Sequence, residues 1–126
     1  MKSAARTGAT AVGSAAERAA AEFLRARGYH ILERNFRCRG GEIDLIALDG
    51  STLVFVEVKV RRTLSRGAPI EAVTAQKQSR VRAAAQEYLT FCGRVFHRIR
   101  FDVISVVQTP RTRELTHLKS AFAPSA

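Results

Sequence analysis

The most constraining feature of the sequence is a run of apolar residues inside the segment 52–60. Positions 53–56 are Leu, Val, Phe and Val, a pattern typical of a strand that is buried on both faces of a sheet. Glu57 follows at once. Burying an ionised carboxylate costs roughly several kcal/mol of folding free energy unless a partner offsets the cost. The run therefore predicts a central strand that carries a carboxylate in need of a partner.

Helix and turn signals predict the other elements. The alanine-rich segment 14–27 favours a helix, with Ser14 as N-cap, Glu17 in the capping-box position and Gly28 after the last turn. Asp49-Gly50 predicts a hairpin. The expected order is a helix at 14–27, strands at 29–33, 42–48 and 52–60, a helix from 71 to about 91, and strands at 98–107 and 115–118, with a basic turn at 37–41 and a loop at 63–69. The second helix allows the strands on either side of it to pair in parallel through a right-handed crossover, which gives a mixed sheet with helices against it.

A chain of 126 residues corresponds to one domain. We expect a single folded domain at 14–120, a flexible tail at 1–13 and a frayed end at 121–126. No apolar run approaches the roughly 20 residues of a membrane span. The two cysteines, Cys38 and Cys92, are too few for a disulfide framework. We expect free thiols in a reducing, cytoplasmic compartment.

Charge indicates the class of partner. The chain has 21 Lys and Arg against 11 Asp and Glu, a net charge of +10. Such an excess favours nucleic acid ahead of an anionic membrane surface, although a high pI also serves solubility alone. Trp is absent and aromatic residues make up 7%, which argues against a stacking platform for single strands.

Acidic residues break local rules at three places. Glu57 and Lys59 share one face of the central strand, and Glu42 and Asp44 share one face of the strand before it. The hairpin makes these strands neighbours. On its helix, Glu17 has only apolar neighbours three, four and seven positions later, so it lies on the packing face. These acids are expected to converge.

Clustered carboxylates beside a lysine suit a divalent cation. Mg²⁺ is typically bound by one or two carboxylates, with water and substrate phosphate as the other ligands. The metal lowers the pKa of a bound water, and Lys59 would orient that water or contact the scissile phosphate. Two structural alternatives stay open: a buried Glu57–Lys59 pair that only satisfies itself, and Glu17 as a simple capping residue.

Other polar residues are weaker candidates. Lys77 lies on the apolar face of the second helix, and either reaches the site or extends past the apolar residues to water. Gln76 is a neighbouring alternative, and Glu42 either supports the site or is only the first polar residue of its strand. The residues that follow Lys59 are either phosphate contacts or solvated charges: Arg61, Arg62 and Arg66.

Two further groups are interpreted as structural. Asp102 and Arg100 are two residues apart on a predicted strand and favour an ion pair over a metal ligand. The three histidines show no metal-ligand spacing and are predicted to be non-catalytic: His30, His97 and His117.

The ordered acids match a known pattern. Asp44, followed by Glu57-Val58-Lys59 on the next strand, resembles the catalytic core of the PD-(D/E)XK nuclease superfamily. Glu17 on a preceding helix is similar to the archaeal Holliday-junction-resolvase branch. The segments Gly-Glu-Ile-Asp-Leu-Ile at 41–46, Val-Phe-Val-Glu-Val-Lys at 54–59 and Arg-Phe-Asp-Val-Ile at 100–104, with the Lys77 helix, look more closely like the bacterial YraN family of endonuclease-like proteins.

The resemblance implies a restriction-endonuclease-like α/β fold, a three-layer core with a mixed sheet of five strands flanked by helices. It also implies Mg²⁺ or Mn²⁺ and the hydrolysis of phosphodiester bonds in DNA. By position, Asp44 and Glu57 are the metal ligands and Lys59 is the catalytic lysine. Glu17 is the accessory acid and a third candidate metal ligand. Ile43 stands where the superfamily has Pro. The resolvases further imply a homodimer.

The leading hypothesis is therefore a metal-dependent endonuclease that acts on structured or branched DNA. The alternative is a nucleic-acid-binding module that keeps the nuclease fold with little or no catalysis. A third interpretation is a basic protein of the membrane surface or the ribosome.

Overall fold

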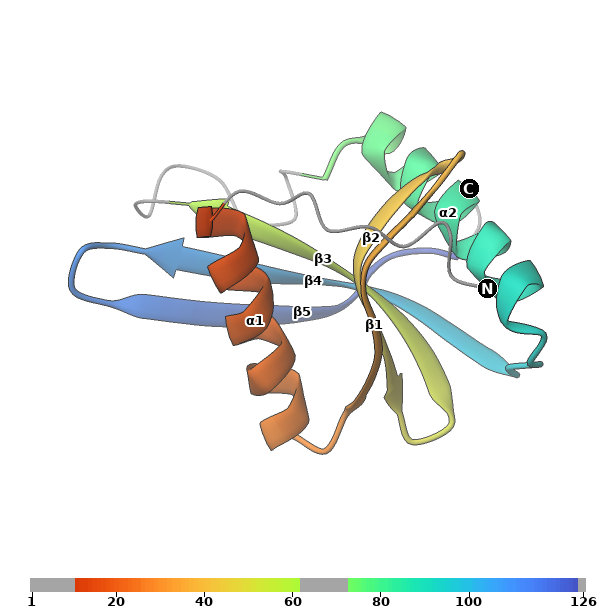
Figure 1. Cartoon of the computed structure of the whole chain (residues 1–126), viewed down its shortest axis with the longest axis horizontal. Coiled ribbons are helices and arrows are strands. Elements are labelled where there is room, and N and C mark those ends of the chain that lie inside the picture. Colours follow the sequence, from red (N-terminus) through yellow and green to blue (C-terminus); the bar gives the residue numbers. More distant parts are fainter. Residues whose placement is uncertain (1–10, 62–72, 125–126) are drawn as a thin grey trace.

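The computed structural model describes residues 11–61 and 73–124, which form a five-stranded mixed sheet with helices against it (Figure 1). This confirms the predicted restriction-endonuclease-like α/β architecture. None of the helices in these two ranges is long and apolar enough to cross a membrane. The elements are α1 (Ala11–Ala26), β1 (His30–Cys38), β2 (Gly41–Asp49), β3 (Thr52–Arg61), α2 (Ala75–Cys92), β4 (Arg98–Gln108) and β5 (Arg113–Phe122).

The strands lie in the sheet in the order in which they occur in the chain. β1, β2 and β3 form an antiparallel meander, and the turn between β2 and β3 consists of Gly50 and Ser51. β3 pairs in parallel with β4, and α2 lies between them in the chain. β5 pairs antiparallel with β4 at one edge. The central position of β3 and its parallel partner were both predicted, and both are confirmed.

The two helices cover opposite faces of the sheet. Val54 and Val56 of β3 belong to the apolar cluster that includes the alanines and Leu24 of α1. Leu53 and Phe55, which alternate with them, belong to the cluster that includes the apolar residues of α2. Because successive side chains of a strand point to opposite faces, α1 and α2 sandwich the sheet. The three-layer core follows from the apolar run at 53–56.

The helix α1 begins earlier than expected. It starts at Ala11, so Ser14 lies inside the helix, and its Oγ accepts a hydrogen bond from the Arg18 guanidinium at 3.2 Å. The capping-box interpretation of Ser14 and Glu17 is therefore wrong, because a residue inside the helix cannot be its N-cap. Residues 11–13 are helical, whereas residues 1–10 of the predicted tail lie outside the described residues. Gly28, with φ +90°, follows the helix as expected.

Three other boundaries differ from the prediction. β1 runs to Cys38 instead of residue 33, because it pairs along the whole length of β2 as far as Gly41. The predicted basic turn at 37–41 shrinks to residues 39–40. β5 runs to Phe122, so residues 121–122 are not frayed. Backbone pairing with a long neighbour extends a strand whose own sequence has a weak pattern.

The helix α2 begins at Ala75, after the N-cap Thr74, whose hydroxyl accepts a hydrogen bond from the Lys77 amide at 3.1 Å. The predicted start at residue 71 and the predicted loop at 63–69 lie outside the described residues. A threonine N-cap was available in the sequence, and it explains why helical geometry starts only after it.

The turn between β1 and β2 packs closely against α2. The Gly40 amide donates a hydrogen bond to Glu87 Oε2 at 2.8 Å. A Cβ atom on Gly41 would lie 2.7 Å from the backbone carbonyl oxygen of Arg80. These contacts hold the end of the β1–β2 hairpin against the middle of α2, between Arg80 and Glu87.

Replacing Gly41 with alanine is expected to lower the free energy of unfolding by about 1–3 kcal/mol, because backbone atoms of α2 must move to make room. Urea denaturation would measure the change. Gly40→Ala is the matched control, since its nearest contact is the movable Glu87 carboxylate at 2.7 Å. Equal losses in the two variants would contradict the argument from the Arg80 carbonyl.

Candidate active site

Asp44 and Glu57 meet where β2 and β3 stop pairing. The register between the two strands runs from Asp49 opposite Thr52 to Leu45 opposite Val56. Beyond it, Asp44 Oδ2 accepts a hydrogen bond from the Val58 amide at 2.7 Å. The half-buried carboxylate thus takes the place of a backbone acceptor and stands beside Glu57 on the neighbouring strand.

Glu57 is buried, with 4% of its surface exposed. Its Oε2 forms an ion pair with Lys77 Nζ of α2 at 3.0 Å. Its Oε1 is buried and has no hydrogen-bond partner among the described residues. A buried carboxylate oxygen without a partner is costly and calls for an explanation. The arrangement would be explained if Glu57 Oε1 binds a cation or a water molecule.

Glu17 approaches the same site from α1 and is also buried, with 7% of its surface exposed. Its Oε1 accepts a hydrogen bond from Asn35 Nδ2 at 2.7 Å. Asn35 lies in β1 with φ +55°, a left-handed conformation that asparagine tolerates better than most residues. Sequence reasoning missed Asn35, because the only local signal is an asparagine inside a weakly patterned strand.

The carboxylates influence one another electrostatically. Burial, and then the negative charge of Glu57, raise the pKa of Asp44 well above its ordinary value, and the charge of Glu17 adds to the effect. Burial also raises the pKa of Glu17, against the opposing hydrogen bond from Asn35. Burial would lower the pKa of Lys77, but the Glu57 carboxylate outweighs burial and raises it. Asp44 is therefore close to two other acids, and the positive charge of Lys77 partly offsets their negative charge.

The donor set fits a hard divalent cation. Asp44 and Glu57 supply oxygen ligands of the kind that Mg²⁺ and Mn²⁺ prefer, and Glu57 Oε1 is a donor without a partner. Within 11–61 and 73–124, no three acidic, His or Cys side chains are already arranged around one metal position. Two carboxylates are sufficient for Mg²⁺ when water and substrate phosphate complete its coordination. Asp44 and Glu57 thus fit the two ligands that the resemblance implies. Glu17 interacts electrostatically with Asp44.

The structure shows where most of the other predicted site residues lie. Lys59 is half-buried on β3, two residues after Glu57. Gln76 is exposed on α2. Glu42 is exposed and forms an ion pair with Arg37 at 2.9 Å, so it interacts mainly with its neighbouring strand. Arg61 ends β3. Arg62 and Arg66, the other two predicted phosphate contacts, lie outside the described residues.

The sequence allows two positions for the Lys77 ammonium, at the carboxylates or in water. The ion pair with Glu57 places its ammonium at the carboxylates. Spacing on α2 could not decide this, because the answer depends on the contact between α2 and β3.

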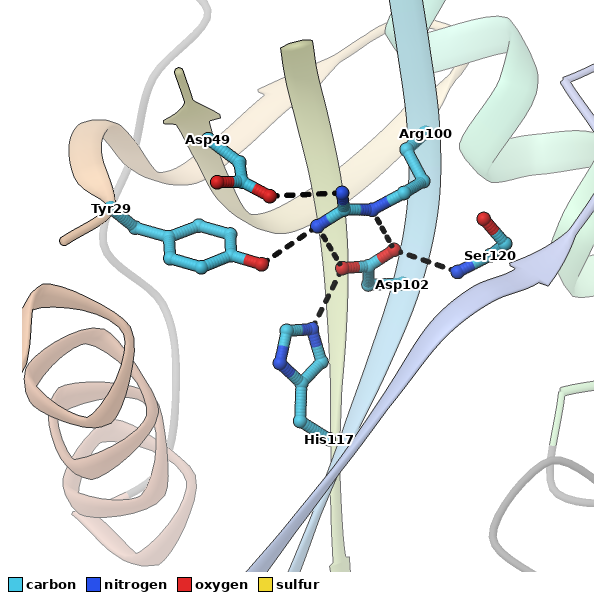
Figure 2. A network of polar contacts seen from close by, with 6 residues as sticks. All are labelled: Tyr29, Asp49, Arg100, Asp102, His117 and Ser120. Atoms are coloured by element: carbon cyan, nitrogen blue, oxygen red, sulfur yellow. Dashed lines mark hydrogen bonds and ion pairs between the residues drawn. The ribbon is translucent and has the colours of Figure 1, made fainter. Parts of the chain in front are cut away.

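A second polar network lies on the α1 side of the sheet (Figure 2). Asp102 is fully buried and accepts hydrogen bonds from Arg100 Nε at 2.9 Å and from the Ser120 amide at 3.0 Å. His117 Nε2 lies 2.7 Å from its Oδ2. The Arg100 guanidinium also donates to Tyr29 Oη at 2.8 Å and to an Asp49 oxygen at 3.0 Å. The predicted Arg100–Asp102 ion pair is confirmed, and it joins β4 to β5, to the residue after the Gly28 turn and to the β2–β3 hairpin.

The raised pKa of Asp44 predicts that its charge destabilises the metal-free fold. An acid whose pKa is higher in the folded state binds its proton more tightly there, so stability falls as the pH rises through that raised pKa. Asp44→Asn, which keeps an acceptor for the Val58 amide, is expected to raise stability at neutral pH by about 1 kcal/mol. Thermal unfolding in the presence of a chelator would measure the gain.

The same gain should shrink as the pH falls and vanish below the ordinary aspartate pKa, because Asp44 is then protonated in both the folded and the unfolded state. Glu22→Gln, which removes an exposed acid from α1, is the charge control and should change stability little. A lower melting temperature for Asp44→Asn at neutral pH would contradict this electrostatic account.

Comparison with known proteins agrees with the motifs. Residues 16–106 match the model of the "Uncharacterised protein family UPF0102". A UPF0102 protein of Symbiobacterium thermophilum is 56% identical over 102 residues, which are 81% of this chain and 86% of that protein. UPF0102 proteins of Nocardia farcinica and Geobacter sulfurreducens are 50% identical over 113 residues and 46% identical over 112 residues, covering 89% and 88% of both chains in each pair. The chain therefore belongs to the UPF0102 family, the YraN family that its motifs resemble.

Proposed function

We propose that this protein is a metal-dependent endonuclease that hydrolyses phosphodiester bonds in DNA. The observation that carries the proposal is the buried Glu57, with one unpartnered oxygen, beside Asp44 on the neighbouring strand. The net charge of the whole chain, +10 with the acidic cluster included, favours a nucleic-acid substrate. Membership of the UPF0102 family supports a nuclease at the level of the family.

The residues divide the chemistry among them. Asp44 and Glu57 would hold Mg²⁺ or Mn²⁺, which supplies an activated water at neutral pH and stabilises charge on the phosphate. Lys59, on the same face of β3 as Glu57, would orient the attacking water or hold a phosphate oxygen. Glu17 keeps negative charge next to Asp44 and thereby strengthens the attraction for a cation. Lys77 neutralises Glu57. When Glu57 binds the metal instead, Lys77 would hold a phosphate oxygen.

The substrate class follows from resemblance as well as charge. Glu17 on α1, close to Asp44, is similar to the accessory acid of the archaeal Holliday-junction resolvases. Structured or branched DNA is therefore the proposed substrate. A homodimer, which would present two such sites to a junction, is part of the same proposal.

One contact favours a second candidate function. The ion pair between Lys77 and Glu57 already neutralises the carboxylate that would bind the metal. If this pair is stable in the presence of Mg²⁺, the protein is a DNA-binding module on a nuclease fold. Such a module would bind DNA in a salt-sensitive manner without cutting it.

A cleavage assay separates the two functions. Labelled duplex, single strand, flap and four-way junction would be incubated with Mg²⁺, with Mn²⁺ or with a chelator. Cleavage that requires the metal supports the endonuclease and identifies the preferred structure. Substrates that shift in a gel but stay intact would favour the binding module.

Metal affinity gives an independent test. Calorimetric titration with Mn²⁺ would compare wild type with the Asp44→Ala, Glu57→Ala double variant. An unchanged affinity in the double variant would remove the proposed metal site.

A further inference from the structure

A cleft of about 340 Å³ opens between the β1–β2 turn and α2. Four cationic side chains line it, and we call it the basic cleft: Arg37, Arg39, Lys77 and Arg80. Glu42 also lines it and is paired with Arg37 at 2.9 Å. The volume corresponds to roughly ten molecules of liquid water. The basic cleft therefore combines an excess of positive charge with room for an anionic group and its hydration.

The fold builds this cleft from segments that are distant in the chain. Arg37 and Arg39 come from the β1–β2 hairpin, and Arg80 comes from α2. The hydrogen bond from the Gly40 amide to Glu87 and the close approach of Gly41 to the Arg80 carbonyl hold the two segments together. Gathering like charges this closely destabilises a protein. A bound anion would offset that repulsion.

The basic cleft adjoins the carboxylates. Lys77 lines it, and the Nζ of the same Lys77 lies 3.0 Å from Glu57 Oε2. The acidic site by itself repels the polyanion that it is proposed to cut. Cations immediately beside the site are therefore needed to hold the strand. Arginine is well suited to this task, because its planar guanidinium donates two parallel hydrogen bonds to a phosphate.

We propose that the basic cleft binds a backbone phosphate of the DNA strand, next to the phosphate at the Asp44 and Glu57 carboxylates. Arg39 and Arg80 are the principal contacts, since both line the cleft and neither forms an ion pair with another described residue. Lys77 connects the two positions. The inference rests on the proposed function for the identity of the anion, and it assigns the direction in which the strand leaves the acidic site, toward the β1–β2 turn and the start of α2.

DNA binding in a chelator tests the cleft without cleavage. The fluorescence anisotropy of a labelled short duplex would be titrated with wild type and with an Arg39→Gln, Arg80→Gln double variant over a range of salt concentrations. Each lost phosphate contact lowers the slope of log affinity against log salt by about 0.9. We expect the slope of the cleft variant to fall by about one to two, and its affinity at moderate salt to fall by about tenfold.

The matched control is an Arg94→Gln, Arg111→Gln double variant, which removes the same charge from exposed residues outside the cleft lining. Arg94 follows the opposite end of α2, and Arg111 lies in the β4–β5 turn. The control should keep most of the wild-type slope and affinity. Equal losses of affinity in both double variants would overturn the proposed phosphate site, since DNA binding would then depend on total charge alone. Wild type that binds no duplex would also overturn it.

The outcome is separable from the proposed function. Selective loss of binding in the cleft variant establishes the phosphate site even if no DNA is ever cut. Metal-dependent cleavage that is the same in the cleft variant and in the charge control would reject the cleft and leave the endonuclease standing. Circular dichroism on each variant would verify that the exposed substitutions leave the fold intact.

Discussion

Glu57→Gln is expected to reduce the rate of metal-dependent DNA cleavage by at least about 100-fold. Glutamine keeps the shape of the side chain but removes the charge that would hold the cation. Lys77 also loses its ion pair, and its partly exposed ammonium can turn to water or to a phosphate. DNA binding should therefore persist, or become tighter, while cleavage is lost. Single-turnover cleavage with excess protein would separate the chemical step from binding.

Glu42→Gln is the matched control for this result. Glu42 is an exposed acid on β2, two residues before Asp44, and its ion pair is with Arg37. Because exposed ion pairs contribute little, its loss should change the cleavage rate only slightly. A Glu57→Gln protein that cuts DNA as fast as wild type would show that the buried carboxylate has a purely structural role.

Asp102→Ala is expected to lower the free energy of unfolding by about 3–5 kcal/mol, the range for breaking a buried ion pair by removing one partner. Asp102 is fully buried, and it accepts hydrogen bonds from Arg100 and from the Ser120 amide (Figure 2). Its loss leaves the Arg100 guanidinium and that amide without this acceptor. Chemical denaturation would measure the change, and a loss below about 1 kcal/mol would contradict the argument.

Asp49→Asn provides the comparison, since Asp49 contacts the same guanidinium but is far more exposed. Its loss should be several times smaller. The network also predicts a pH dependence. Burial alone would raise the pKa of Asp102, but hydrogen bonds from His117, Arg100 and the Ser120 amide outweigh it and lower the pKa. An acid with a lowered pKa stabilises the fold above its unfolded value, here 3.8, and this contribution is lost as the pH falls through the folded value.

The sheet could be predicted from the sequence because its central strands have strong local patterns. The apolar run before Glu57 indicated a strand with other elements packed on both of its faces. The helix between two long strands indicated that these strands pair in parallel. The same patterns brought Asp44 next to Glu57. Hydrophobic pattern and turn chemistry are local properties, so they are visible without coordinates.

The features that the sequence did not predict are those that depend on contacts between residues far apart in the chain. Nothing near Asn35 indicates that its amide reaches Glu17, eighteen positions earlier on α1. His117 reaches Asp102 only because β5 pairs with β4, with an irregular register between Phe101 and Val103. The extended β1 depends in the same way on a neighbouring strand. Each of these features depends on how elements pack, which spacing within one element does not contain.

The connection between β3 and β4 also affects how the chain folds. Asp44 and Glu57 belong to strands joined by a two-residue turn, so a local hairpin pairing brings them together. β4 can pair with β3 only after the chain has passed through α2, and closing that long loop costs conformational entropy before any contact is gained. The acidic hairpin should consequently form early, and the transition state of folding should be limited by the arrival of β4. During synthesis, the hairpin would leave the ribosome before Lys77 and would carry its paired acids without the neutralising ammonium.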